Sequence, residues 1–241
     1  MKDERMIQMT FQTHDTLGNI VTAFPNSAHI FKKYQIDYCC GGDRTLKEAV
    51  SDTELKAETL VNELSEYYKS LEPSTNDWTL SPLDELIQYI LQAHHAYLYN
   101  TLPKLSQLTA KILRVHGKHH PELSDVFQTF HALKTEMDMH LIKEETVQYP
   151  AIETYLQSHK QEDLNQAVNV ITELKDEHSN TGDALKKLRK ITDNYHIPED
   201  VCETFVKTYK LLEELESNTF THIHLENNIL FKRLEKLDNR L

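Results

Sequence analysis

Two pairs of histidine and glutamate have the spacing of metal ligands on helices. His140 and Glu144 are four residues apart, as are His222 and Glu226, so on a helix the side chains of each pair lie on one face, one turn apart. Both pairs fall on stripes of apolar residues, which places the carboxylates in a core. An unpaired buried carboxylate costs several kcal/mol or takes up a proton. Each glutamate therefore requires a buried partner, which is a cation, a hydrogen-bond network or a metal ion.

Apolar residues at steps of three and four define these stripes. The stripe that leads to His140 contains Leu123, Phe127, Phe130, Leu133 and Met137. The stripe that leads to His222 contains Val201, Phe205, Leu212, Leu215 and Thr219. His95 and His178 interrupt two further stripes, so four helices each contribute one inward histidine. Because 14 histidines make one such pair expected by chance, the position on the stripes is the stronger observation.

Four long amphipathic helices must position these side chains. They are expected at residues 82–115, 121–157, 162–194 and 198–237. Pro198 is expected in the first turn of the last helix, where proline is favoured. Four helices with short connections form an up-down-up-down bundle. The sequence therefore predicts an all-α fold with this bundle at residues 81–241.

Ligands of one site must also lie at one level of the bundle. His95 and His140 are each about 22 residues from the turn between their helices, and His140 and His178 are each about 19 residues from the next turn. At 1.5 Å per residue, His222 lies about 9 Å out of register with His178. The last helix must therefore overhang the end of the third.

The number of donors favours two metal ions. Four imidazoles and two carboxylates exceed the four ligands of a tetrahedral zinc ion. In four-helix bundles, inward carboxylates bridge pairs of iron or manganese ions, there with Glu-x-x-His spacing, whereas the order here is His-x-x-x-Glu. Nitrogen and oxygen donors of intermediate softness fit iron better than thiolate-binding metals. Glu144 and Glu226 are the expected bridges.

A small helical domain is expected at residues 17–72, after an N-terminal extension at 1–16. Turn-forming residues cluster at 73–77, where the apolar periodicity stops, so a linker is expected at 73–80. The predicted small domain contains the sequence Cys39-Cys40-Gly41-Gly42, whose glycines are expected to allow a tight turn with positive φ.

Cys39 and Cys40 have two readings. Adjacent cysteines bond to each other only through a strained ring, so reduced thiols are expected. In the structural reading they are a small apolar pair before a turn. In the functional reading they are catalytic thiols, either redox-active or transient iron ligands, with a pKa lowered by the helix that follows.

Composition excludes several classes of partner. A formal net charge of −12 argues against a nucleic-acid or anionic-membrane surface, which requires an excess of Lys and Arg. No apolar run approaches the ~20 residues of a membrane-spanning helix, and the first residues lack the apolar region of a signal peptide. A cytoplasmic protein that binds neither nucleic acid nor membrane is expected.

Three stretches resemble the RIC (repair of iron centres) family. They are Tyr34–Gly42 (YQIDYCCGG), His140–Glu145 (HLIKEE) and His222–Phe231 (HIHLENNILF), and the likeness extends from about Leu17 to Phe231. The resemblance implies a haemerythrin-like bundle with a non-haem, oxo- and carboxylate-bridged di-iron centre. It favours His95 over His94 and Glu144 over Glu145, and implies the iron ligands His95, His140, Glu144, His178, His222 and Glu226.

The chain departs from the family pattern beside the expected site. Where the family often has Leu-Phe-Pro, this chain has Gln148-Tyr149-Pro150 and, near its end, Leu230-Phe231-Lys232. These residues flank the expected ligands, so the departures bear on the detail of the pocket more than on metal binding.

The resemblance implies repair of iron-sulfur clusters damaged by oxidative or nitrosative stress, by iron donated from a labile site to damaged iron-sulfur proteins. Two alternatives stay open, a haemerythrin-like O2 or NO binder or sensor and a di-iron nitric oxide reductase. A simple gas carrier has no need of the Cys39-Cys40 domain, but the residues do not separate repair from NO reduction. They also leave open whether the small domain docks on the bundle or pairs with a second copy in a homodimer.

Overall fold

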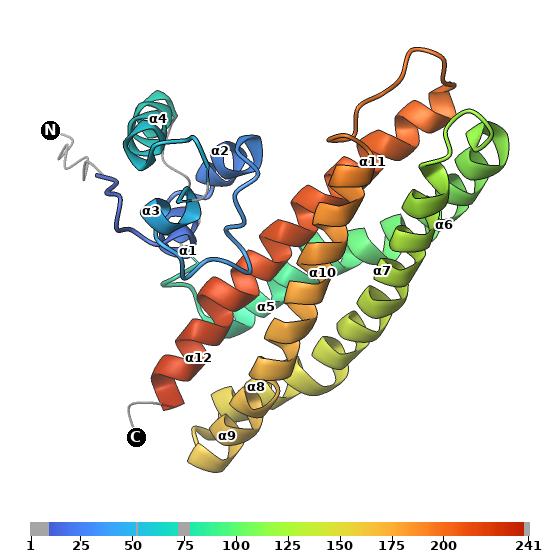
Figure 1. Ribbon diagram of the computed structural model, residues 1–241. Coiled ribbons are helices and arrows are strands. Elements are labelled where there is room, and N and C mark those ends of the chain that lie inside the picture. The colour runs from blue at the N-terminus through green and yellow to red at the C-terminus, as the bar shows by residue number, and fades with distance from the viewer. Residues whose placement is uncertain (1–9, 52, 72–77, 239–241) are drawn as a thin grey trace, which may run out of the picture.

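The computed structural model describes residues 10–51, 53–71 and 78–238 (Figure 1). Within these ranges the regular structure is helical, apart from one isolated bridge between Thr16 and Thr45. The N-terminal part, here called the small unit, contains α1 (Leu17–Ala23), α2 (Ser27–Lys33), α3 (Leu46–Ala49) and α4 (Ala57–Ser70). The predicted all-α fold is confirmed.

Four long rods, each made of consecutive helical segments, form the up-down-up-down bundle (Figure 1). The first rod is α5 (Leu83–Ile90), η1 (Leu91–His95) and α6 (Ala96–His116), and the second is α7 (Leu123–Lys143), η2 (Glu144–Gln148) and α8 (Tyr149–Ser158). The third rod is α9 (Gln161–Asn169) and α10 (Ile171–Ile191), and the fourth is α11 (Glu203–His224), η3 (Leu225–Leu230) and α12 (Phe231–Asp238).

The end of the third rod and the start of the fourth differ from the prediction. The expected helix at 162–194 is interrupted at Val170 and ends at Ile191, and the fourth rod begins at Glu203 instead of Pro198. Residues 193–195 all have positive φ, between 49° and 60°, which a right-handed helix does not allow. These residues end the third rod, and Pro198 lies in the connection that leads to Glu203 and not in the first turn of a helix.

The expected overhang of the fourth rod is present. His178 lies 13 residues before the end of α10, whereas His222 lies 19 residues after the start of α11, a difference of about 9 Å along the axis. Phe205, in the first turn of α11, reaches the connection between α6 and α7, where its ring centroid lies 5.4 Å from that of His120. This shift brings His222 to the level of the other inward histidines.

The small unit docks on the bundle at η3. The side-chain nitrogen of Asn228 donates hydrogen bonds to the carbonyl oxygens of Tyr38 (3.4 Å) and Cys39 (3.1 Å). A Cβ atom at Gly18 or Gly42 would lie 2.3 or 2.2 Å from the Asn228 side-chain oxygen. No glycine in the described residues has positive φ, so the prediction for Gly41 and Gly42 was wrong. Gly42 is required by this close approach and not by a left-handed turn.

Apolar packing and ion pairs extend this docking. Buried apolar side chains of the small unit and of the bundle form one continuous cluster. Lys186 of α10 pairs with Asp37 at 2.7 Å, and Lys32 of α2 pairs with Glu213 of α11 at 3.1 Å. The predicted linker residues 73–77 lie outside the described residues, and the division into an extension, a small domain, a linker and a bundle stays a prediction.

None of the described helices has both the length and the apolar composition needed to cross a bilayer.

Replacing Gly18 by alanine tests the docking. In Gly18→Ala the new methyl group must displace the Asn228 side chain, so we expect the free energy of unfolding, measured by urea denaturation, to fall by about 1–3 kcal/mol. Gly182→Ala is the control, because its Cβ meets only the Cys40 sulfur at 3.3 Å and alanine favours a helix by about 1 kcal/mol over glycine. Equal stabilities of the two variants would contradict the proposed role of Gly18.

Candidate metal centre

The four histidines and two glutamates singled out from the sequence lie together in the bundle interior. Each is at most 3% exposed. The shortest contacts link imidazole Nε2 atoms to carboxylate oxygens: His140 lies 3.0 Å from Glu144, and His222 lies 3.0 Å from Glu226. His178 lies 3.1 Å from Glu226, and His95 lies 3.3 Å from Glu144.

These donors form two groups whose ligand atoms lie within 4.8 Å of one another. One group contains His140, Glu144, His178 and Glu226, and the other contains His95, Glu144 and His222. Glu144 belongs to both, because its Oε1 faces His140 and its Oε2 faces His95. This is the arrangement of a carboxylate shared between two cation positions.

Three of the four carboxylate oxygens of this cluster lack a hydrogen-bond donor within the described residues. Both oxygens of Glu144 and Oε2 of Glu226 are buried and accept no well-formed hydrogen bond, although imidazole nitrogens lie within 4 Å. Buried charges are normally paired or coordinate a metal. The orphaned oxygens and the converging Nε2 atoms therefore fit a bound cation.

Polar groups outside the cluster hold three of the imidazoles by their other nitrogen, Nδ1. The acceptors are Glu145 for His95 (2.8 Å), Glu177 for His140 (2.7 Å) and Asn227 for His178 (2.8 Å). A ligating histidine usually donates its second N–H in this way, which fixes the ring and directs Nε2 toward the metal.

Sequence reasoning did not assign these three acceptors. The sequence pattern offers Glu145 only as a rival ligand to Glu144, and it gives Glu177 and Asn227 no role. Each of the three adjoins a predicted ligand in the sequence, and that adjacency is the signal that could have identified them.

Wide π-helical turns occur at the ligands of three rods. η1 ends at His95, η2 begins at Glu144 and η3 contains Glu226, whereas His178 lies within the α-helix α10. A π turn carries one extra residue and is frequent at functional sites. All six residues of η3 are buried, so Asn227 and Asn228 find interior partners directly after Glu226.

Ionisation couples the members of the cluster. Burial raises the pKa of the carboxyls, but the surrounding imidazoles outweigh it, holding the pKa of Glu144 well below its usual value and lowering that of Glu226 to about 2. Burial lowers the pKa of the imidazoles, but the carboxylates outweigh it and raise the pKa of His140 to about 9 and of His178 to about 10. Without a metal, protons on these imidazoles balance the carboxylates.

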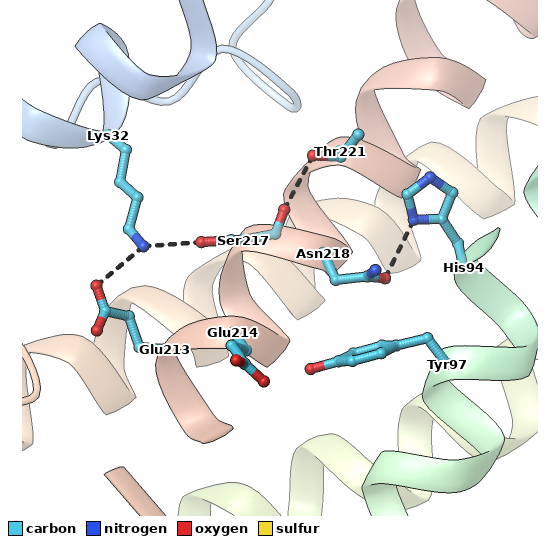
Figure 2. Close-up of a pocket in the computed structure, with 8 residues that line it drawn as sticks. All are labelled: Lys32, His94, Tyr97, Glu213, Glu214, Ser217, Asn218 and Thr221. Atoms are coloured by element: carbon cyan, nitrogen blue, oxygen red, sulfur yellow. Dashed lines mark hydrogen bonds and ion pairs between the residues drawn. The ribbon is translucent and has the colours of Figure 1, made fainter. Parts of the chain in front are cut away.

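His94 lies beside the cluster and not in it. Its ring stacks on that of His222 with centroids 5.8 Å apart, and its Nδ1 lies 3.1 Å from the Asn218 side-chain oxygen. On its other side His94 lines a pocket of about 700 Å³ between α2, α6 and α11, where Lys32 spans from the small unit to α11 (Figure 2). Burial lowers the pKa of His94 to about 4, so this ring is neutral at pH 7.

His224 serves the docking of the small unit. Its ring lies 5.9 Å from that of Tyr38, and its Nδ1 lies 3.2 Å from the Asn228 side-chain nitrogen, which donates to it. Burial lowers the pKa of His224 to about 3. This histidine is therefore a neutral part of the interface and not a member of the cluster.

Cys39 and Cys40 lie outside the metal cluster, but Cys40 contacts the backbone of the cluster residue His178. Their sulfurs are 3.7 Å apart, and the Cys40 thiol donates to the carbonyl oxygen of His178 at 3.3 Å. Asp37 accepts the backbone N–H groups of both cysteines and forms a third donor group with their thiols. Burial raises the pKa of the Cys39 thiol well above its usual value, so the expected lowering by the following helix is wrong for this residue.

Comparison with known proteins gives matches over both parts of the chain. Residues 13–68 match ScdA_N, a domain of unknown function (DUF542), and residues 86–234 match the hemerythrin HHE cation binding domain.

Named relatives match along most of their length. The iron-sulfur cluster repair protein ScdA of Staphylococcus haemolyticus is 34% identical over 217 residues, which cover 90% of this chain and 96% of the relative. The iron-sulfur cluster repair protein YtfE of Escherichia coli O157:H7 is 33% identical over 217 residues, 90% of this chain and 94% of the relative. With its cation-binding bundle and this likeness along both proteins, the chain belongs to the ScdA/YtfE family, which confirms the resemblance to the RIC proteins.

Proposed function

We propose that this protein repairs iron-sulfur clusters damaged by oxidative or nitrosative stress, by donating iron from a labile di-iron site. The observation that carries the proposal is the buried cluster of four imidazoles around two carboxylates, three of whose four oxygens accept no hydrogen bond. The names of the relatives, both iron-sulfur cluster repair proteins, supply the class of reaction. The damaged iron-sulfur proteins are the partners in this proposal.

The six predicted ligands would hold two iron ions, one at each donor group. His140 and His178 belong to the first group, His95 and His222 to the second, and Glu144 to both. Imidazole and carboxylate donors suit iron, and the bound ions would supply redox chemistry and the iron to be delivered. The protein's own part is to keep the Nε2 atoms converged through acceptors on Nδ1.

The charge of the cluster supports weak binding of iron at this site. Two carboxylates offset only part of the charge of two iron ions, and the remaining donors are neutral imidazoles. Protons compete for the same nitrogens, because the carboxylates raise the pKa of His140 to about 9 and of His178 to about 10. Metal affinity in such a site falls as the pH falls.

Cys39 and Cys40 are proposed as thiols that receive the leaving iron as transient ligands. Support comes from their place against α10, where Cys40 contacts the backbone of His178, and from the donor group they form with Asp37. A role in gas binding alone would not require this loop.

Glutamate 144 gives a direct test of the metal site. We expect Glu144→Leu to lose at least one iron per chain, measured by metal analysis after reconstitution. We expect the metal-free variant to be less stable than the unaltered chain at pH 7, because His140 and His178 lose a carboxylate that raises their pKa and removing one partner of a buried ionic group is destabilising. Glu153→Leu, at an exposed position of α8, is the control. Full iron content in Glu144→Leu would indicate that Glu144 is a hydrogen-bonded core acid and not a metal ligand.

Repair itself can be measured on a damaged client. Iron-loaded protein incubated with a dehydratase whose cluster has been damaged by peroxide or NO should restore the activity of the dehydratase, and Glu144→Leu should restore much less. Iron content is recorded before and after transfer. Equal recovery with the variant would sink the repair proposal. A reversible absorption change with O2 or NO and no loss of iron would favour a gas-binding protein.

The metal-free protein should lose stability as the pH rises from 7 to 8.5. Below pH 6.5, the usual imidazole value, His140 and His178 are protonated in both the folded and unfolded chains, so their stabilisation is fully present. Above pH 6.5 only the folded chain keeps these protons, until the pH reaches the raised pKa values of about 9 for His140 and about 10 for His178. The free energy of unfolding should fall by about 1.4 kcal/mol per pH unit for each retained proton.

Urea denaturation across this pH range measures the slope. Glu144→Leu should show a shallower slope, because Glu144 is a main cause of the raised pKa of His140. A stability that stays constant or rises would contradict the assigned protonation of the cluster.

A further inference from the structure

Four side-chain rings form a continuous path, here called the ring path, from the surface to the metal cluster. The ring of Trp78, the only tryptophan in the sequence, has its centroid 4.6 Å from that of Tyr89. The Tyr89 ring lies 5.7 Å from the ring of His94, and His94 stacks on His222 with centroids 5.8 Å apart. Rings at these separations are in contact. The ring path therefore joins an indole to an imidazole of the donor cluster.

The outer end of the ring path is held in place and reaches solvent. Tyr89 lies in the last turn of α5 and is 36% exposed, and Trp78 is partly exposed. The indole packs against the apolar cluster that contains Leu83 of α5. Arg233 of α12 donates hydrogen bonds to the carbonyl oxygens of Trp78 (2.9 Å) and Ser81 (2.7 Å). These contacts fix the indole beside Tyr89.

The inner end of the ring path is buried and equally well held. His94 is 4% exposed, and its Nδ1 lies 3.1 Å from the Asn218 side-chain oxygen. Its ring lies within 11° of parallel to that of His222. His94 belongs to neither donor group of the cluster. Metal ligation thus gives His94 no role, whereas its position between Tyr89 and His222 completes the path.

Tyr89 is better placed than Tyr149 to give up an electron. A phenol that loses one electron also loses its proton, which needs an acceptor. Water can accept the proton of the exposed Tyr89. Tyr149 is nearer to the cluster, but it is 2% exposed and its Oη donates a hydrogen bond of 2.7 Å to Oε1 of the buried Glu226. The Tyr149 proton has no such direct way to water.

An extra electron is needed when peroxide meets a partly emptied site. Hydrogen peroxide, an agent of oxidative stress, takes up two electrons when both of its oxygens become water. Bound ferrous iron supplies one electron per ion. A site that donates its iron passes through a state with one ion left, and the second electron is then missing. Reduction by a single electron would release a hydroxyl radical, which attacks nearby side chains.

We propose that Tyr89, in contact with Trp78, supplies this second electron to the cluster through the rings of His94 and His222. One tyrosine, one ferrous ion, one peroxide and one proton give one tyrosyl radical, one ferric ion and two molecules of water. Tyr89 loses an electron and its phenolic proton, and the O–O bond of the peroxide breaks. Transfer of an electron from Trp78 to the tyrosyl radical then carries the radical outward to the indole.

A soluble thiol is the class of reductant that restores the pair. It returns one electron and one proton, and two such thiols end joined as a disulfide. The inference deepens the proposed function, and it rests on that function only in requiring that the cluster bind iron.

Oxidation at Trp78 tests the inference. The chain is loaded anaerobically with half an equivalent of ferrous iron, so that most loaded chains hold one ion, and is mixed with hydrogen peroxide. Electron paramagnetic resonance of rapidly frozen samples should show an organic radical, and mass spectrometry of tryptic peptides should later show oxygen added to Trp78. Metal-free chain treated in the same way should show neither. Absence of the radical from the iron-loaded chain would overturn the inference.

Phenylalanine variants locate the electron donor. Tyr89→Phe keeps the ring but not the oxidisable phenol, so it should lose both the radical and the oxidation of Trp78. Trp78→Phe should keep a radical, now on tyrosine, which ring deuteration of tyrosine would identify by a narrowed spectrum. Tyr155→Phe is the control, because the Tyr155 ring contacts His159 and lies outside the ring path. It should behave as the unaltered chain does.

Three results would overturn the inference. The first is oxidation of Trp78 that persists in a Tyr89→Phe chain with unchanged iron content. The second is a radical that Tyr149→Phe abolishes while it still binds iron. The third is suppression of Trp78 oxidation by dimethyl sulfoxide, which traps hydroxyl radicals in solution and would reveal a diffusing oxidant. The Trp78→Phe and dimethyl sulfoxide measurements decide the matter even where circular dichroism shows that Tyr89→Phe fails to fold.

The outcomes separate this inference from the proposed function. A radical that depends on Tyr89, in a protein that fails to restore the damaged dehydratase, would uphold the ring path and reject repair. Restoration of the dehydratase by a protein that forms no radical would do the reverse. A chain that binds no iron after reconstitution would overturn both.

Discussion

Burial of two carboxylates in the middle of a helix bundle is the constraint on which the rest of this structure depends. Glu144 and Glu226 are fully buried, and a buried charge without a partner is costly enough to unfold a domain of ordinary stability. The imidazole of one histidine from each rod faces these carboxylates. In the metal-free protein, protons on these imidazoles balance the charge of the carboxylates. The same converging imidazoles and carboxylates provide the donors for cations.

The helices alone were largely predictable, because periodicity of three and four residues reports which face is buried. The same pattern singled out His95, His140, His178 and His222, since a polar residue on an apolar stripe has few explanations. What the pattern could not show were the π turns, because a uniform helical period was assumed and each π turn adds a residue. The end of α10 was missed because nothing in the types of residues 193–195 demands three consecutive left-handed conformations.

The groups around the ligands were harder to predict than the ligands. Glu145 and Glu177 are partly exposed and charged, as solvated residues of a helix are, and only the fold shows that each accepts the Nδ1 proton of a cluster histidine. Tyr149 presented the opposite difficulty. Its ring fits an apolar stripe so well that the sequence gives no sign of the hydroxyl contact with Glu226.

Three consecutive residues of η3 connect the metal cluster to the thiols. Glu226 faces the cluster histidines, Asn227 holds His178, and Asn228 holds the carbonyl of Cys39. The Cys40 thiol also contacts this region, because it donates a hydrogen bond to the backbone carbonyl of His178. A shift of η3 that moved Glu226 would therefore also strain the anchor of His178 and the cysteine loop. Because interiors are close-packed and yield little, a displacement of η3 is expected to move the donor cluster and the cysteine loop together.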